Sequence, residues 1–177
     1  MKKTIYVLPL GVIEPTLLAE ISRGINLAFG YQVEIMAITT NPSYAFEARR
    51  QQYYSGKILE KLTQKLPSDS AKIIGVTSVD LATPVLTFVF GEAQLNGAAS
   101  VISINRLRQE FYELLPNQKL LTCRAVKEAI HELGHSFGLL HCDDSECVMH
   151  FSSNITGIDQ KDVNFCTKCL QILQNQI

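Results

Sequence analysis

The order of apolar patterns along the chain predicts an α/β fold built on a mixed, mostly parallel five-stranded sheet. Segments patterned as strands and helices follow in the order strand, helix, strand, helix, three strands and helix. Parallel neighbours need a crossover, and a helix between two strands provides one. The composition agrees, because 177 residues with 46% apolar and 19% charged side chains suit one globular domain with a proper core.

The first half of the chain supplies two of these strands and two helices. Residues 3–10 form an apolar run that predicts the first strand, and residues 15–29 place apolar side chains at helical spacing. Residues 31–38 alternate between apolar and polar side chains, which predicts a second strand. Residues 39–56 are polar and aromatic, so we expect a long surface connection with a turn or two of helix. Residues 57–66 then predict a short helix.

The second half supplies the remaining strands and the last helix. Residues 71–79 and 99–104 are apolar segments typical of buried strands, and a further strand is expected from Leu86 to Phe90. Residues 106–115 predict a helical turn or two. The last helix is expected to begin near Thr122, a reasonable N-cap, and to run to about residue 138.

The chemistry of the chain is concentrated at the end of this last helix. His131 and His135 are four residues apart, so a helix places both imidazoles on one face. Two neutral imidazoles in that arrangement can bind one Zn²⁺ at about 2.0–2.1 Å each. Glu132 lies one residue round the helix, where it is less suited to bind the metal and better suited to accept a proton from a zinc-bound water.

A third histidine requires the helix to end. If the helix continued, His141 would lie about 9 Å further along the axis than His135 and on another face, out of reach of the same ion. Gly138 occupies the position of a left-handed cap, a conformation that glycine adopts at little steric cost. The sequence therefore predicts two ligands, a base, a hinge and a third ligand in that order.

This string is the metzincin signature, HExxHxxGxxH, and Met149 follows at a plausible Met-turn position. His141 is followed directly by Cys142, and Cys147 and a later CxxC pair complete the pattern HExxHxxGxxHCx4CxM…CxxC. This pattern resembles the archaemetzincins, a metzincin family with a second zinc site. The motif-bearing part covers residues 131–169, about a fifth of the chain.

The resemblance implies a metzincin-like fold, with a backing helix and an active-site helix on the sheet. It implies that Met149 forms a hydrophobic floor under the zinc ligands. It also implies an antiparallel edge strand that borders the cleft and pairs with an extended peptide or protein substrate. By chain order we expect that strand near Leu86 to Phe90. Residues from His150 to Asn154 would line the pocket on the primed side of the scissile bond.

Four of the five cysteines form a candidate second site, made of Cys142, Cys147, Cys166 and Cys169. Four thiolates suit a closed, tetrahedral and therefore structural Zn²⁺; two disulfides or free thiols are the alternatives. Cys123 has no partner by spacing and is expected to be an ordinary core or surface residue. We expect one peptidase domain over residues 1–177. Within it, residues 142–177 would form a small C-terminal subdomain that this zinc attaches to residues 1–141.

The predicted function is hydrolysis of peptide bonds with a zinc-bound water and Glu132 as general base. One alternative is a catalytically silent module that binds zinc and peptide at the same two metal sites, and another is a zinc amidohydrolase for a small molecule. Glu132 favours an enzyme, because a purely structural site needs no base. Phe151 has no hydroxyl with which to assist the reaction, and His150 is either an oxyanion donor or an ordinary loop residue.

Charge and hydropathy exclude several other classes. The net charge of −1 gives no reason to expect nucleic acid or an anionic membrane as a partner. No apolar run reaches the roughly 18–20 residues needed to cross a bilayer. Lys2 and Lys3 precede an apolar run, but no small-residue cleavage site follows it, so we expect a cytoplasmic protein. The sequence does not indicate an oligomeric state.

Overall fold

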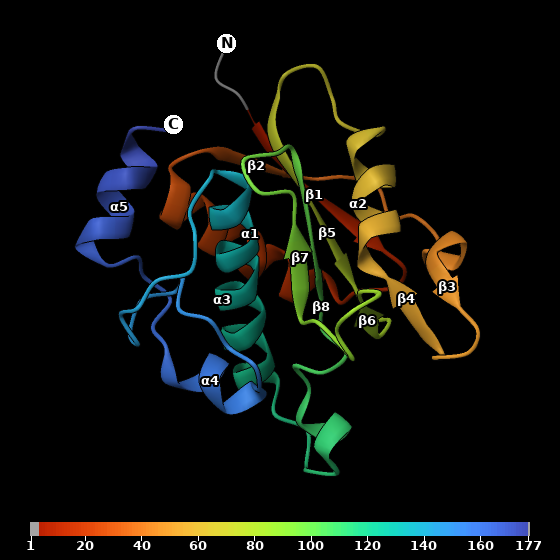
Figure 1. The fold of residues 1–177 in the computed structure, drawn as a ribbon. Coiled ribbons are helices and arrows are strands. Elements are labelled where there is room, and N and C mark those ends of the chain that lie inside the picture. The colour runs from red at the N-terminus through yellow and green to blue at the C-terminus, as the bar shows by residue number, and fades with distance from the viewer. Residues whose placement is uncertain (1–3, 177) are drawn as a thin grey trace.

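A five-stranded, mostly parallel sheet runs through the centre of the computed structural model, which describes residues 4–176 (Figure 1). Its strand order is β2-β1-β5-β8-β7. The strands are β1 (Thr4–Leu10), β2 (Gln32–Ile35), β5 (Ser70–Thr77), β8 (Ala99–Ser103) and β7 (Gly91–Ala93). All neighbours pair in parallel except β7, which runs antiparallel to β8 at the edge. The predicted mostly parallel five-stranded sheet is therefore confirmed.

Helices cover both faces of this sheet. The helices α1 (Pro15–Phe29) and α3 (Gln118–Ser136) lie on one face and α2 (Ser55–Thr63) lies on the other (Figure 1). The alternation of side chains along each strand decides which core they enter. In β5, for example, Ile74 packs with α1 and α3, whereas Ile73 packs with α2.

The first strand and the first helix occur where the sequence predicts them. The helix α1 ends at Gly30, whose φ of +71° is the left-handed conformation that glycine adopts most easily. Lys3, the expected first residue of the first strand, lies outside the described residues. The second strand is shorter than the predicted range 31–38, and its side chains are mostly exposed because β2 is an edge strand.

The prediction of a strand from Leu86 to Phe90 is wrong. This segment is a loop, and the antiparallel edge strand begins only at Gly91. The loop is held by Arg50, whose guanidinium donates to the carbonyl oxygens of Leu86 at 2.6 Å and Thr87 at 2.9 Å. These carbonyl oxygens bond to side chains rather than to a neighbouring strand, and the segment forms only an isolated bridge between Val89 and Leu81.

Residues 39–56 are more ordered than predicted. They contain the short helix η1 (Ser43–Ala45) and the strands β3 (Phe46–Glu47) and β4 (Gln52–Tyr54), which form a second small sheet with β6 (Leu81–Ala82). These strands are two or three residues long, too short for an alternating pattern to identify. The next helix, α2, begins at Ser55 rather than at residue 57.

The helix α3 begins before the predicted N-cap. Its N-cap is Asn117, whose side chain accepts a hydrogen bond from the N–H of Leu120 at 3.0 Å. Thr122 lies inside the helix, and its hydroxyl donates to the carbonyl oxygen of Gln118. The short helix η2 (Gln109–Tyr112) confirms the helical turn expected between β8 and α3.

The C-terminal residues pack into the core on the face of the sheet that α1 and α3 cover. The short helices α4 (Ile155–Gln160) and α5 (Thr167–Gln174) follow α3 in the chain (Figure 1). Val148, Met149, Ile158 and Leu173 are buried in the same apolar cluster as α1 and α3. None of the helices within residues 4–176 combines the length and the apolar character that crossing a membrane requires.

Candidate metal centres

Three histidines converge at the end of α3 and in the segment that follows it. The helix presents His131 and His135, and the chain then turns back and brings His141 beside them. One ring nitrogen from each of the three lies within 4.8 Å of the other two. We call these three residues the histidine cluster.

Hydrogen bonds of the ring nitrogens leave the cluster ready for a metal. The Nδ1 atoms of His131 and His135 lie 2.8 Å from the carbonyl oxygen of Val148 and 2.7 Å from that of Leu139. A carbonyl only accepts, so each Nδ1 carries the proton and each Nε2 carries a lone pair. The two Nε2 atoms face each other at 3.1 Å. Facing lone pairs repel unless a cation lies between them, and tetrahedral ligands at about 2.0–2.1 Å from Zn²⁺ have nearly this separation.

Burial keeps these ligands neutral. The pKa of His131 is held well below its ordinary value by burial and by the positive charge of Lys161. Burial also lowers the pKa of His135 and of His141. A histidine binds a metal as the neutral imidazole, with one nitrogen protonated and the other free, so the environment favours the form that binds zinc.

The turn that brings in the third histidine depends on Gly138. Its φ is +91°, in the left-handed region. Its N–H donates to the carbonyl oxygen of His135 at 2.9 Å, and the N–H of Leu139 donates to that of Gly134 at 2.9 Å. These bonds satisfy carbonyls at the end of α3 as the chain reverses.

Glu132 is buried in the same cleft as the histidine cluster. A cleft of about 420 Å³ is lined by Glu132, by all three histidines of the cluster, and by residues of β7. Glu132 packs directly against Gly91 of β7. A side chain would not fit at position 91, because its Cβ would lie 2.6 Å from Cγ of Glu132. Burial, reinforced by the neighbouring carboxylate of Glu128, raises the pKa of Glu132 well above its ordinary value.

Met149 lies beneath α3 and is fully buried. It packs against Gly134, where any added Cβ would overlap with the Met149 sulfur. Its carbonyl oxygen accepts a hydrogen bond from the N–H of Cys142 at 3.0 Å, which ties the Met149 segment to the residue after His141. The ring of Phe151 lies 5.0 Å from that of His141.

Replacing Met149 with alanine is expected to destabilise the protein by about 2–5 kcal/mol, because it opens a cavity under α3. Met149→Leu, which nearly conserves the volume, is expected to cost less than about 1.5 kcal/mol. Urea unfolding of the zinc-loaded proteins measures both changes. Equal stabilities for the two variants would contradict a packing role for Met149.

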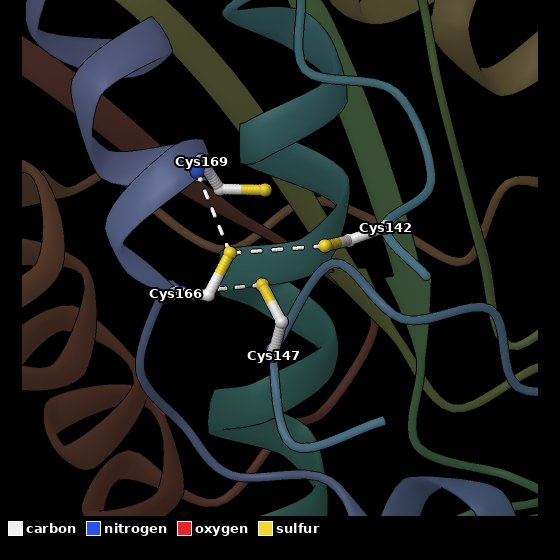
Figure 2. Close-up of side chains that lie close together, drawn as sticks. All are labelled: Cys142, Cys147, Cys166 and Cys169. Carbon is white, nitrogen blue, oxygen red and sulfur yellow. Dashed lines mark hydrogen bonds between the residues drawn. The ribbon is translucent and has the colours of Figure 1, made fainter. Parts of the chain in front are cut away.

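The four predicted cysteines also come together, and we call them the cysteine cluster (Figure 2). Their sulfur atoms all lie within 4.8 Å of one another. Figure 2 shows Cys142 and Cys147 on the segment after α3, facing Cys166 and Cys169 at the start of α5. The sulfurs of Cys142 and Cys166 are 3.7 Å apart, much further than the about 2.05 Å of a disulfide. All four thiols are free, and this spacing suits a tetrahedral ion with metal–sulfur distances of about 2.3 Å.

The surroundings of the cysteine cluster shift the pKa values of three of its thiols in different directions. Burial raises the pKa of Cys147 and of Cys169. The backbone N–H of Cys169 points at the sulfur of Cys166 and lowers the pKa of that thiol. Because a metal requires thiolates, binding at this cluster releases protons. Cys123, the fifth cysteine, is exposed and lies apart from it.

The structure adds residues that the sequence patterns did not identify. Glu128, one turn before Glu132, lines the cleft, as do Glu92 of β7 and Lys161, which is only 2% exposed. No spacing rule links Lys161 to the motif, because it lies directly after another helix, α4, and twenty residues after His141. Glu128 did carry a signal, since it lies four residues before Glu132 on the same face of α3.

The segment expected to line the primed side divides between two hollows. Phe151, Ser152 and Ser153 line both the cleft and a neighbouring polar pocket, whereas His150 and Asn154 line only the polar pocket. The ring of His150 contacts the carbonyl oxygen of Cys142 through Nδ1 at 2.9 Å. The ring of His150 therefore contacts the backbone of the first residue of the CxxxxC pair, and His150 does not line the cleft that holds Glu132.

The chain is similar to known proteins in both sequence and fold. The model of peptidase family M54 matches residues 22–175. The archaemetzincin of Methanocaldococcus jannaschii is 42% identical over 172 residues, covering 97% of this chain and 93% of the relative. The crystal structure of archaemetzincin from Methanopyrus kandleri superposes with a TM-score of 0.86 at 32% identity, covering 99% of this chain and 95% of that one. A zinc-dependent peptidase from Methanocorpusculum labreanum gives a TM-score of 0.88 at 31% identity, covering 96% and 99%.

Proposed function

Because the chain belongs to the archaemetzincins, peptidase family M54, and is a zinc metallopeptidase, we propose that its histidine cluster holds the catalytic zinc and that Glu132 is the general base. The observation that carries this assignment is the shared cleft. Two Nε2 lone pairs face each other at 3.1 Å, and the Glu132 carboxyl group lines the same space.

A zinc ion held by His131, His135 and His141 would supply Lewis acidity, which would lower the pKa of a water molecule and offset negative charge on the peptide carbonyl oxygen. Glu132 accepts the proton of the attacking water and then delivers it to the leaving amine. Its raised pKa suits this double role, because a carboxyl group with an ordinary pKa is a weak base and a poor donor at neutral pH. His131 and His135 are fixed by backbone carbonyls, so they need little rearrangement during the reaction.

The edge strand β7 supports binding of an extended peptide. In an antiparallel pair, alternate residues bond to the partner strand. The carbonyl oxygen of Phe90 accepts from Ser103 and the N–H of Gln94 donates to Ala99, so Phe90, Glu92 and Gln94 face β8. The N–H and C=O groups of Gly91 and Ala93 therefore point away from β8. We propose that a peptide substrate adds to this edge as a further strand, with its scissile bond beside the histidine cluster.

A substitution of Ala93 tests this pairing. Ala93→Pro removes the outward N–H without removing a ladder bond to β8, so KM for a peptide is expected to rise by a factor of about 2–10, the equivalent of one hydrogen bond. Ala93→Ser keeps the N–H and serves as the control. Steady-state kinetics on one peptide of several residues measures the effect, and an unchanged KM in Ala93→Pro would argue against strand addition.

The cysteine cluster is proposed to hold the second, structural zinc, and residues 142–177 to form a C-terminal subdomain attached through it to residues 1–141. Four sulfur ligands leave no open position for a substrate. Cys142 follows His141 directly, so an ion at the cysteine cluster also fixes the backbone of a histidine ligand. Met149 and Gly138 complete the proposed site as a packing floor and a hinge.

Zinc content and a peptide-library digest test the assignment together. We expect two zinc ions per chain and cleavage of peptide bonds in the library by the zinc-loaded protein. Two zinc ions without cleavage would favour the catalytically silent binding module instead. Cleavage that survives removal of the Glu132 carboxylate would leave the zinc assignment intact and overturn the role of the base.

A further inference from the structure

The turn between β7 and β8, residues 94–98, lies against the end of the helix that carries two of the histidine ligands. We call it the edge turn. The N–H of Asn96 in this turn donates to the carbonyl oxygen of His135 at 2.9 Å. The side-chain oxygen of Asn96 lies 3.6 Å from the place that a Cβ on Gly138 would occupy. The edge turn therefore contacts both a ligand residue and the glycine at which the chain reverses towards His141.

Lys72 of β5 bonds to both sides of this contact. Its ammonium donates to the carbonyl oxygen of Gly97 in the edge turn and to that of Ser136, the last residue of α3, each at 2.8 Å. The same nitrogen lies 4.7 Å from the centre of the Phe137 ring, within the range of a cation–π contact. The negative end of the helix dipole also favours a positive charge at this place. One side chain therefore joins the edge turn to the end of α3.

The conformation of the edge turn presents these two backbone groups. Asn96 has a φ of +52°, in the left-handed region that asparagine adopts more readily than most residues. The N–H of Gly97 donates to the carbonyl oxygen of Gln94 at 2.8 Å, and a Cβ at position 97 would overlap the side chain of Gln94. The turn is tight and bonded within itself, so its outer N–H and carbonyl are available to His135 and Lys72.

The contact fixes the strand on which the substrate is proposed to pair. At the start of β7, Gly91 packs against Glu132 of α3. Just beyond the end of β7, the edge turn bonds to His135 directly and to Ser136 through Lys72. A short strand that is held near both ends has a fixed distance and direction relative to its neighbour. The outward N–H and C=O groups of β7 therefore keep a defined position relative to the histidine cluster.

We propose that Lys72 is a positioning residue for the substrate, whose ammonium fixes the edge turn to the end of α3 and so sets the distance between a peptide on β7 and a metal in the histidine cluster. The proposal rests on the zinc site and the strand addition proposed above. It differs from a purely structural role, which would stabilise the fold without affecting where a bound peptide lies. The two roles therefore predict different results for short and long ligands.

Two zinc-directed inhibitors of different length test this difference on the zinc-loaded protein. Acetohydroxamate contacts only the metal and its surroundings, whereas a tetrapeptide hydroxamate also pairs with β7. Lys72→Met keeps the length of the side chain and removes the charge. It is expected to bind the peptide hydroxamate about 10-fold more weakly, the equivalent of one or two misaligned hydrogen bonds, and acetohydroxamate as tightly as the wild type does.

Two further variants serve as controls for this experiment. Lys72→Arg keeps the cation and its donors, so it is expected to restore most of the affinity for the peptide hydroxamate. Lys119→Met removes an exposed lysine at the other end of α3 and is expected to match the wild type with both inhibitors. Equal weakening of both inhibitors in Lys72→Met would indicate a structural role and overturn the proposal, as would wild-type affinity for the peptide hydroxamate.

Failure of the proposed function gives a different result from failure of this proposal. If acetohydroxamate does not bind the zinc-loaded wild type, the zinc site is wrong; if the peptide hydroxamate binds no more tightly than acetohydroxamate, strand addition is wrong. Hydrogen exchange needs neither inhibitor, and the N–H of Asn96 is expected to exchange faster in Lys72→Met while α1 is unchanged. An unchanged rate at Asn96 would overturn the proposal by itself. If Lys72→Met does not fold, Lys72→Gln, which keeps one donor group, carries the same predictions.

Discussion

Glu132→Gln is expected to reduce kcat for peptide hydrolysis by a factor of about 10²–10⁴ while both zinc ions stay bound. Glutamine has nearly the shape of glutamate, so it fills the space against Gly91 without adding an atom. It cannot accept the proton of the attacking water or return that proton to the leaving amine. KM is expected to change little, because the edge strand and the metal ligands remain. Stopped assays with mass spectrometry of the products, run beside zinc analysis of the same preparation, measure both quantities.

The matched control for this experiment is Glu60→Gln, on an exposed position of α2 far along the chain from the cleft. It removes the same charge from the protein and is expected to keep wild-type kinetics. Hydrolysis at the wild-type rate by zinc-loaded Glu132→Gln would show that another group accepts the proton. Glu128 and Glu92 line the same cleft, and the corresponding glutamine variants would then identify it.

The histidine cluster was predictable because its geometry is encoded locally. An i, i+4 pair on a helix shares a face whatever the rest of the fold does, and a glycine three residues after His135 permits the reversal that brings in His141. The parallel sheet was predictable for a similar reason. Strands and helices alternate in the sequence, and the connection between parallel strands imposes that alternation on the chain.

The edge of the cleft was harder to predict, because side chains from other segments decide it. Leu86 and Thr87 belong to an apolar stretch that resembles a strand, but Arg50 binds their carbonyl oxygens. The guanidinium of Arg106 also contacts this stretch, with its Cζ 4.3 Å from the centre of the Phe88 ring. Neither arginine is near this loop in the sequence, so no local pattern could separate the loop from the three-residue strand that follows it.

Long-range assembly also explains why Lys161 was missed. Its burial depends on α4 packing against α3 through Arg124 and Asp159, a pair separated by 35 residues. The sequence shows a lysine near two cysteines and several acidic residues, which predicts a solvated charge. Only the packed structure shows that this lysine is buried and lines the same cleft as Glu128 and Glu132.

The two metal clusters are joined by very short stretches of backbone. His141 and Cys142 are neighbours, and the N–H of Cys142 donates to Met149, the residue beneath α3. Helices as short as α4 and α5, with six and eight residues, are marginal without tertiary support. The first turn of α5 is organised by Cys166, whose sulfur accepts from the N–H of Cys169 at 3.5 Å. A metal at the cysteine cluster would therefore hold α5, the segment after α3 and the third histidine ligand in one arrangement.

Replacing Cys166 and Cys169 together with serine is accordingly expected to remove the second zinc ion and to weaken zinc binding at the histidine cluster by about 10–100-fold, the usual effect of losing support around a metal ligand. Elemental analysis and chelator competition measure these changes, and hydrogen exchange is expected to show faster exchange in residues 142–176 than in α1. Cys123→Ser, at the exposed cysteine, is the control and should behave as wild type. A folded double variant whose histidine cluster keeps wild-type zinc affinity would show that Gly138 and the packing of Met149 suffice to place His141. The cysteine cluster would then stabilise only the C-terminal segment.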